Sequence, residues 1–224
     1  MPLFYQQDIN ETTKLGVWKI EESEDFFLKA VPLQRNITHP HKRLQHLAGR
    51  YLLPYLFLDF PNDEIEIADT QKPFLPDEKY HFSISHCGDY AAAIVSSNER
   101  VGIDIEMITA RVERIKYKFL NTDELVFVHA HEKDIQIPLL TLLWSAKEAM
   151  FKWWGRGDVD FSEVLLTKNF PFATTGIIPA VFHKDACAVS LSVHYQMREG
   201  LSLAWVVGGL EGLKGLNGLK GLKN

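Results

Sequence analysis

The 224-residue sequence has few of the features that mark secreted, membrane-embedded or nucleic-acid-binding proteins. Its only two cysteines, Cys87 and Cys187, lie far apart and predict no disulfide framework. No apolar run approaches the roughly 20 residues that a membrane-spanning helix needs. The first residues lack the basic and apolar regions of a signal peptide, so we expect a cytoplasmic protein with no membrane span.

Basic charge and common catalytic or zinc motifs are also scarce. The net charge is −5, whereas a general nucleic-acid binder shows a basic excess, so we expect no nucleic-acid partner. No C-x-x-C occurs, and His129 and His131 are two apart in a predicted helix, where they do not share a face; zinc is therefore not favoured. A G-x-S-x-G nucleophile motif is absent as well.

The remaining composition, with 46% hydrophobic and 24% charged residues, is that of an ordinary globular protein. Each half of the chain combines predicted helices with short strands, which favours an α+β fold. We expect a pseudo-twofold pair of similar lobes, each a small, mostly antiparallel sheet packed with helices. The predicted division is an N-terminal lobe over residues 1–106, a C-terminal lobe over 107–207 and a low-complexity Gly-Leu tail over 208–224.

Hydrophobic periodicity gives the individual elements. Tight connections between three predicted strands indicate an antiparallel meander over residues 80–86, 90–96 and 100–105. The other elements are listed by range: a strand at 17–20, helices at 21–31, 41–58, 122–132 and 139–154, and further strands at 64–68, 163–167, 177–182, 188–196 and 201–207.

The strongest local anomaly is the segment WSAKEAMFK, residues 144–152. It lies in an apolar helix that should avoid charge, because burying an unpaired ion costs several kcal/mol. Glu148 and Lys152 are four residues apart and share one face of this helix. They are either an ordinary surface pair or a carboxylate and an ammonium directed into a cleft.

A second anomaly is the segment VGIDIE, residues 101–106, which alternates as a half-buried strand does. The alternation places Gly102, Asp104 and Glu106 on one face. Two carboxylates at this spacing repel each other, and a divalent cation such as Mg²⁺ would relieve the conflict. Gly102 would leave the same face open for a ligand. An exposed strand face is the alternative.

Candidate phosphate-binding side chains precede these segments. The helix at 41–58 carries Arg43 and Arg50 seven residues apart, on one face, where two arginines could bind a phosphate. Lys72 lies in a predicted turn. Ser85 and His86 end a predicted strand and point to opposite faces, so they are poorly placed as nucleophile and base, and a phosphate-binding histidine is the simpler functional role.

Taken in order, these segments resemble the surfactin-type 4′-phosphopantetheinyl transferases. The resemblance covers roughly residues 40–170, and the tail departs from it. Its motifs are QKPF at 71–74, FSISH at 82–86, VGIDIE at 101–106 and WSAKEAMFK at 144–152.

The resemblance implies transfer of 4′-phosphopantetheine from coenzyme A to a serine of an apo carrier protein, with release of 3′,5′-ADP. It implies that Mg²⁺, with Mn²⁺ as an alternative, is held by the carboxylates Asp104, Glu106 and Glu148. It also implies a monomer. Asp104, Glu148 and Lys152 would be the catalytic residues. Coenzyme A would be bound by Arg43, Arg50, Lys72, Ser85, His86 and Lys152.

Several points stay open at the level of sequence. The base for the carrier serine could be Glu148, Lys152, a metal-bound water or, by the resemblance, Glu124. A basic patch of Arg111, Arg114 and Lys118 is a candidate docking surface for an acidic carrier, and a solvated face is the alternative. Two other functions remain: a Mg²⁺-dependent phosphohydrolase or nuclease, and a catalytically idle carrier-binding module.

Overall fold

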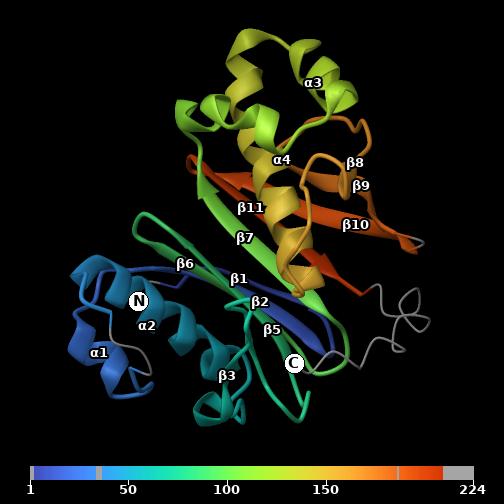
Figure 1. The fold of residues 1–224 in the computed structure, drawn as a ribbon. Coiled ribbons are helices and arrows are strands. Elements are labelled where there is room, and N and C mark those ends of the chain that lie inside the picture. Colours follow the sequence, from blue (N-terminus) through green and yellow to red (C-terminus); the bar gives the residue numbers. More distant parts are fainter. Residues whose placement is uncertain (1–2, 34–36, 186, 209–224) are drawn as a thin grey trace.

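The computed structural model describes residues 3–33, 37–185 and 187–208. Two antiparallel sheets pack face to face, and each is covered on its outer face by one long helix, which gives four layers in the order helix, sheet, sheet, helix (Figure 1). The predicted α+β fold, with two helix-covered antiparallel lobes, is confirmed. No helix among the described residues is long and apolar enough to span a membrane.

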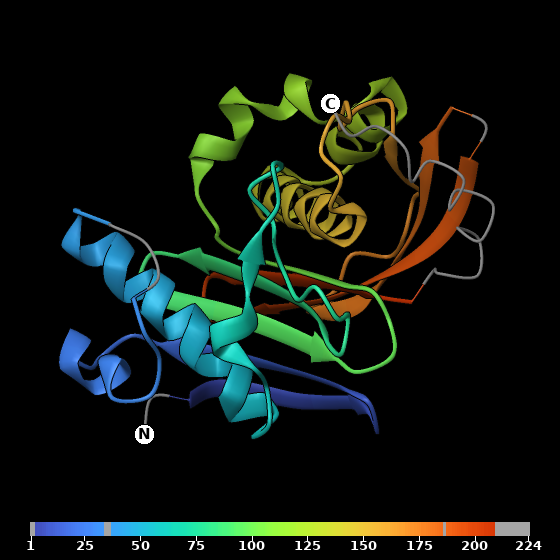
Figure 2. The same cartoon turned by 60° about the horizontal axis from the view of Figure 1, so that its bottom comes forward.

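The N-terminal sheet has the strand order β1-β2-β6-β5. Helix α2 lies against one face of this sheet, where its buried leucines contact alternate residues of β6. A short helix, α1, packs beside α2, as the view from below shows (Figure 2). The bounds are β1 (Leu3–Asn10), β2 (Thr13–Lys19), α1 (Glu24–Leu28), α2 (Pro40–Leu56), β5 (His81–Cys87) and β6 (Tyr90–Ser96).

The C-terminal sheet has the strand order β7-β11-β10-β9-β8. Helix α4 crosses its outer face and supplies most of the helical part of that core. The bounds are β7 (Val101–Met107), α3 (Thr122–His129), α4 (Lys133–Trp154), β8 (Leu165–Thr167), β9 (Thr175–Lys184), β10 (Cys187–Arg198) and β11 (Leu201–Val207). Helix α4 ends at Gly155, whose φ of 70° is a left-handed cap that favours glycine.

Short elements complete the chain. Residues 62–74 form a small two-stranded ribbon that carries the loop with Lys72. The bounds are η1 (Asn62–Glu64), β3 (Glu66–Ile67), β4 (Pro73–Phe74), η2 (Ala110–Arg114) and η3 (Lys116–Lys118).

The predicted meander is wrong for its third strand. Strands β5 and β6 form the expected hairpin, but β7 leaves this sheet and pairs with β11 of the other one. Its alternating apolar side chains, Val101, Ile103 and Ile105, fill the space between the two sheets. The strand therefore belongs to the second sheet by hydrogen bonding and contacts the first sheet by packing.

Other differences from the sequence-based expectations are local. The basic residues Arg111, Arg114 and Lys118 lie on two 3-10 turns, and the strand β1 was not anticipated. Pro54 lies inside α2, which continues to Leu56. The division of the chain into lobes at residue 106 stays a prediction, and the tail from residue 209 onward lies outside the described residues.

The sequence suggested that Gly102 would leave space for a ligand, but the structure shows no such space. A Cβ atom at this position would lie 2.0 Å from the carbonyl oxygen of Ala149 and 2.6 Å from the backbone nitrogen of Trp153. The space beside Gly102 is thus filled by the backbone of α4. This glycine lets the helix approach β7 closely, which brings the polar side chains of both elements together.

We therefore expect Gly102→Ala to lower the free energy of unfolding by about 3 kcal/mol or more, because backbone atoms cannot move aside as a side chain can. Urea unfolding measures this loss. Gly16→Ala is the matched control: the nearest atoms to its added Cβ would be the ends of the Leu52 and Leu56 side chains, at 3.2 and 3.4 Å. A loss no larger than that of the control would contradict the close packing of β7 and α4.

Candidate functional site

Three polar side chains from three distant segments meet where β7 faces α4. Asp104 is 3% exposed, and its Oδ1 accepts hydrogen bonds from Ser85 Oγ at 2.7 Å and from Lys152 Nζ at 2.6 Å. Lys152 Nζ also lies 2.9 Å from Ser85 Oγ. β5, β7 and α4 each contribute one member, so the fold brings together three candidate residues that are distant in sequence.

The other two candidate ligands lie close to this trio. Glu106 Oε1 accepts a hydrogen bond from the indole nitrogen of Trp144 at 3.1 Å. Burial first, and then the negative charges of Asp104 and Glu106, raise the pKa of Glu148 to about 7 against the opposing effect of the Lys152 ammonium. The pKa of Glu106 is also raised, first by burial and then by Asp104. The site is therefore a cluster of three carboxylates with a single ammonium among them.

The carboxylate oxygens of Asp104, Glu106 and Glu148 are chemically suitable ligands for a divalent cation. Asp104 Oδ2 is buried without a hydrogen-bond partner, and carboxylate oxygens are the ligands that Mg²⁺ prefers. Within the described residues, no three His, Cys, Asp or Glu side chains are already arranged to hold an ion. Lys152 supplies the counter-charge in this arrangement. A bound cation and Lys152 would therefore compete for Asp104.

Glu124 lies in a separate buried network. Its Oε2 accepts from Lys147 Nζ at 2.6 Å and from Asn121 N at 3.0 Å, and its Oε1 accepts from both the backbone nitrogen and the hydroxyl of Thr167. Lys147, with a fully buried side chain, also donates to the carbonyl oxygens of Phe119 and Phe161. Glu124 is thus a fully bonded structural residue, which argues against its role as a base.

A cavity of about 230 Å³ adjoins Lys152. It is lined by the loop around Lys72, by the buried end of β5 and by the last turn of α4. Lys72 Nζ donates to the carbonyl oxygen of Lys152 at 2.5 Å, and burial together with Arg100 lowers the Lys72 pKa to about 8. The loop with Lys72, far away in sequence, is therefore held against the end of the helix that carries Lys152.

The remaining predicted phosphate contacts are more scattered. Arg43 forms an ion pair with Glu24 of α1, and Arg50 is 4% exposed on the inner face of α2. The exposed His86 has a lowered pKa, mainly through desolvation and further through nearby Lys152. His86 thus lies near Lys152, whereas the structure gives no contact between either arginine and the carboxylate cluster.

Some features of the site were missed by the sequence analysis. Ser83 accepts a hydrogen bond from the backbone nitrogen of Ile103 at 3.2 Å and so joins β5 to β7, and Trp144 holds Glu106. The alternation in residues 82–86 carried a signal for Ser83, which shares its strand face with Ser85.

Burial and nearby carboxylates raise the pKa of Cys87 to about 12, and Cys87 and Cys187 are both free thiols.

Part of the chain matches a known protein family. Residues 100–205 match the family model of the 4′-phosphopantetheinyl transferase superfamily. This region is similar to that superfamily. It contains β7 and α4, and with them every member of the carboxylate cluster and Lys152.

Of three curated relatives, two carry 4′-phosphopantetheinyl transferase names and one is named as a synthase component. Enterobactin synthase component D of Salmonella austin is 34% identical over 113 residues, which cover 50% of this chain and 47% of the relative. The 4′-phosphopantetheinyl transferase gsp of Aneurinibacillus migulanus is 29% identical over 141 residues, covering 61% and 56%. The 4′-phosphopantetheinyl transferase AcpT of Escherichia coli (strain K12) is 32% identical over 114 residues, covering 50% and 57%. The chain thus spans about half the length of the relatives it matches.

The buried Lys147–Glu124 pair generates a stability prediction. Lys147→Met leaves the Glu124 carboxylate buried without its cation, so we expect the free energy of unfolding to fall by about 3–5 kcal/mol. Urea unfolding measures the loss, and the double variant with Glu124→Gln should recover part of it. Lys133→Met, at an exposed position at the start of the same helix, is the control. A loss below about 1 kcal/mol for Lys147→Met would contradict the structural role of this pair.

The raised pKa of Glu148 generates a pH prediction. The folded protein holds this proton more tightly than the unfolded chain, because the pKa is about 7 instead of 4.5. The stability that this proton contributes is therefore complete at low pH. It is lost as the pH rises from 4.5 to about 7. We expect Glu148→Gln to reduce the decline in unfolding free energy between these pH values, measured without divalent cations. A decline unchanged from wild type would show that the carboxylate is not perturbed.

Proposed function

We propose that this protein transfers the 4′-phosphopantetheine group of coenzyme A to a serine hydroxyl of an apo carrier protein and releases 3′,5′-ADP. The single observation that supports this most is the junction of Asp104, Ser85 and Lys152, of which Asp104 and Lys152 lie inside the region matched by the superfamily. Carboxylates beside a lysine and an adjoining cavity suit the binding of a diphosphate.

Asp104, Glu106 and Glu148 are the proposed Mg²⁺ ligands, with Mn²⁺ as the alternative ion. When bound, the cation would supply positive charge against the pyrophosphate oxygens of coenzyme A. The buried, unpartnered Asp104 Oδ2 supports this assignment. Lys152 would then exchange Asp104 for a phosphate oxygen and stabilise the charge that develops on the leaving group.

The cavity beside Lys152 is the proposed place of the nucleotide. Lys72 lines it with an ammonium, and the apolar side chains of Phe82 and Phe151 offer surface for a base. Ser85 and His86 lie next to Lys152 and are proposed to contact phosphates. Arg43 and Arg50, both on α2, are the proposed partners of the 3′-phosphate, for which Arg43 would exchange Glu24.

The carrier serine needs a proton acceptor near the attacked phosphorus. Glu148 suits this role best, because a pKa of about 7 matches a base that works at neutral pH and a carboxylate has a second oxygen available when one binds a cation. Glu124 is disfavoured, since its oxygens are occupied by Lys147, Asn121 and Thr167.

A cavity of about 390 Å³ extends from Glu106 and Trp144 to Arg111. It is the proposed entry for the carrier serine, because it opens beside the carboxylate cluster and has a cation at its border. The exposed Arg111, Arg114 and Lys118 are then in place to contact an acidic carrier surface. A cytoplasmic monomer is the form in which we expect the enzyme to act.

Incubation with coenzyme A, Mg²⁺ and a panel of apo carrier proteins tests this function. We expect a carrier to gain the mass of one phosphopantetheine group. Release of phosphate or ADP without a carrier would indicate a hydrolase instead, and carrier binding without a mass gain would indicate an idle module.

Asp104→Asn should reduce the labelling rate by at least about 100-fold, because it removes charge that holds both the cation and Lys152. Labelling rates and urea unfolding are measured on the same preparations, and Glu99→Gln, a carboxylate at the other end of β7, is the control. A rate loss matched by a loss of folded protein would point to a structural role for Asp104.

A further inference from the structure

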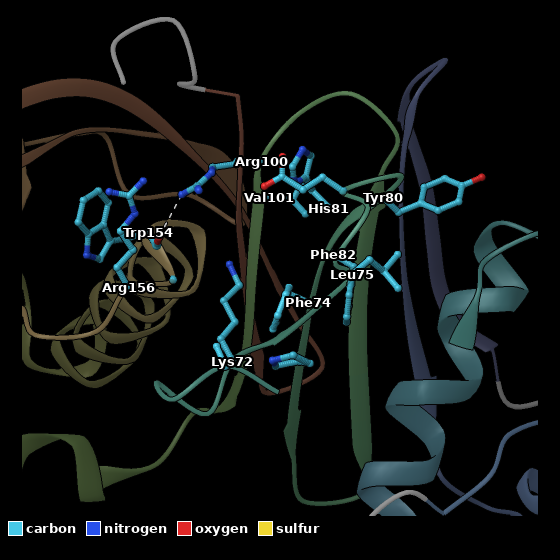
Figure 3. A pocket seen from close by; sticks show the side chains of 14 residues that line it. Lys72, Phe74, Leu75, Tyr80, His81, Phe82, Arg100, Val101, Trp154 and Arg156 are labelled. Carbon is cyan, nitrogen blue, oxygen red and sulfur yellow. Dashed lines mark hydrogen bonds between the residues drawn. The ribbon is translucent and has the colours of Figure 1, made fainter. Parts of the chain in front are cut away.

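A cavity of about 240 Å³ lies on the other side of the Lys72 loop. Its walls are residues 68–82, the start of β7 and the end of α4, and its lining does not include the three carboxylates of the proposed transfer site. Figure 3 shows the labelled side chains of Lys72, Arg100 and Arg156 gathered around it from these three segments. Only Lys72 among these cations also lines the proposed nucleotide cavity.

Each cation is held by the protein in a defined way. Arg100 Nη1 donates to the carbonyl oxygen of Trp154 at 3.1 Å, and the guanidinium carbon of Arg156 lies 5.0 Å from the centre of a Trp154 ring. Lys72 Nζ is bonded to the backbone oxygen of Lys152. These contacts use neutral partners, so they orient the cations without neutralising them.

The positive charge of this cluster is poorly compensated. Among the described residues, no carboxylate forms an ion pair with Lys72, Arg100 or Arg156, and the one acid that lines the cavity, Glu78, is exposed. Burial and then Arg156 lower the pKa of Arg100, an effect that Glu78 partly offsets, while burial and Arg100 lower the pKa of Lys72. Like charges at this distance repel, and an anion between them would remove the repulsion.

We propose that this cavity is a second binding site, which takes a small phosphate-bearing anion other than coenzyme A. Two guanidinium groups and an ammonium around one cavity are the groups that bind phosphate oxygens in pairs. The volume lies below the range of about 300–1,000 Å³ that is typical for drug-sized ligands, so the ligand is small. The indole of Trp154 adds an apolar wall for the part that carries the phosphate.

The position of Lys72 links this site to the proposed nucleotide cavity. Its ammonium lies where the two cavities meet, and a second anion would draw on the same positive charge as the nucleotide phosphates. Occupancy of the second site would therefore weaken the contribution of Lys72 to nucleotide binding. This consequence rests on the proposed function, whereas the site itself does not.

Titration calorimetry with inorganic phosphate tests the site without a carrier or coenzyme A. We expect saturable binding to the full chain, and a loss in affinity of about tenfold or more in Arg156→Gln, because a charge-assisted contact is removed. Arg198→Gln is the matched control: this arginine also lies over aromatic rings, at 5.8 Å, but on a different surface. Binding should be unchanged in this control.

Arg156 is exposed and donates no hydrogen bond to the described residues, so Arg156→Gln should fold. The second variant is Arg100→Lys, which keeps the positive charge but loses the paired donors of the guanidinium group. The proposal is overturned if phosphate does not bind, or if Lys152→Gln loses binding while Arg156→Gln retains it. It is also overturned if Arg156→Gln weakens coenzyme A but not 3′-dephospho-coenzyme A, since the cluster would then serve the 3′-phosphate. Failure of carrier labelling would leave this titration unaffected.

Discussion

The close approach of β7 to α4 is the constraint on which the site depends. Because Gly102 has no side chain, the backbone around Ala149 can lie directly against the strand. This contact fixes the height of α4 over the sheet, and the polar residues on the facing surfaces then meet: Asp104 with Lys152, and Glu106 with Trp144. A wider separation between the two elements would leave a buried carboxylate without a partner, at a high cost in free energy.

The same helix separates two kinds of buried charge. Lys147 is enclosed and bonded to Glu124 and two carbonyl oxygens, so its charge is compensated within the protein. On the other side of the helix, three carboxylates lie around the Lys152 ammonium, and burial together with the neighbouring negative charge raises the pKa values of Glu148 and Glu106. The first arrangement positions the helix, and the second leaves unsatisfied charge that a cation and a diphosphate can use. Consecutive residues, Lys147 and Glu148, thus serve different purposes.

Positively charged side chains gather around two cavities at the end of α4. Lys72 lies between two cavities, one beside Lys152 and the other beside Arg100 and Arg156. The loop that carries Lys72 belongs to the N-terminal half of the chain, and its contacts with the last turn of the helix connect the two lobes. Ligand binding in either cavity would therefore act across the boundary between the lobes.

Sequence alone determined the local patterns, because alternation and helical spacing follow directly from backbone geometry. It predicted the strand with Asp104 and Glu106 on one face, the buried helix with Glu148 and Lys152, and the α+β class, whereas the expected half-buried strand is buried on both faces. Only the tertiary structure decided which sheet β7 joins, since strand pairing depends on residues 201–207 at the far end of the described chain. It likewise decided that Gly102 receives a helix instead of a ligand, and that Glu124 is enclosed by Lys147 and Thr167. These outcomes depend on contacts between segments distant in sequence, which no local pattern records.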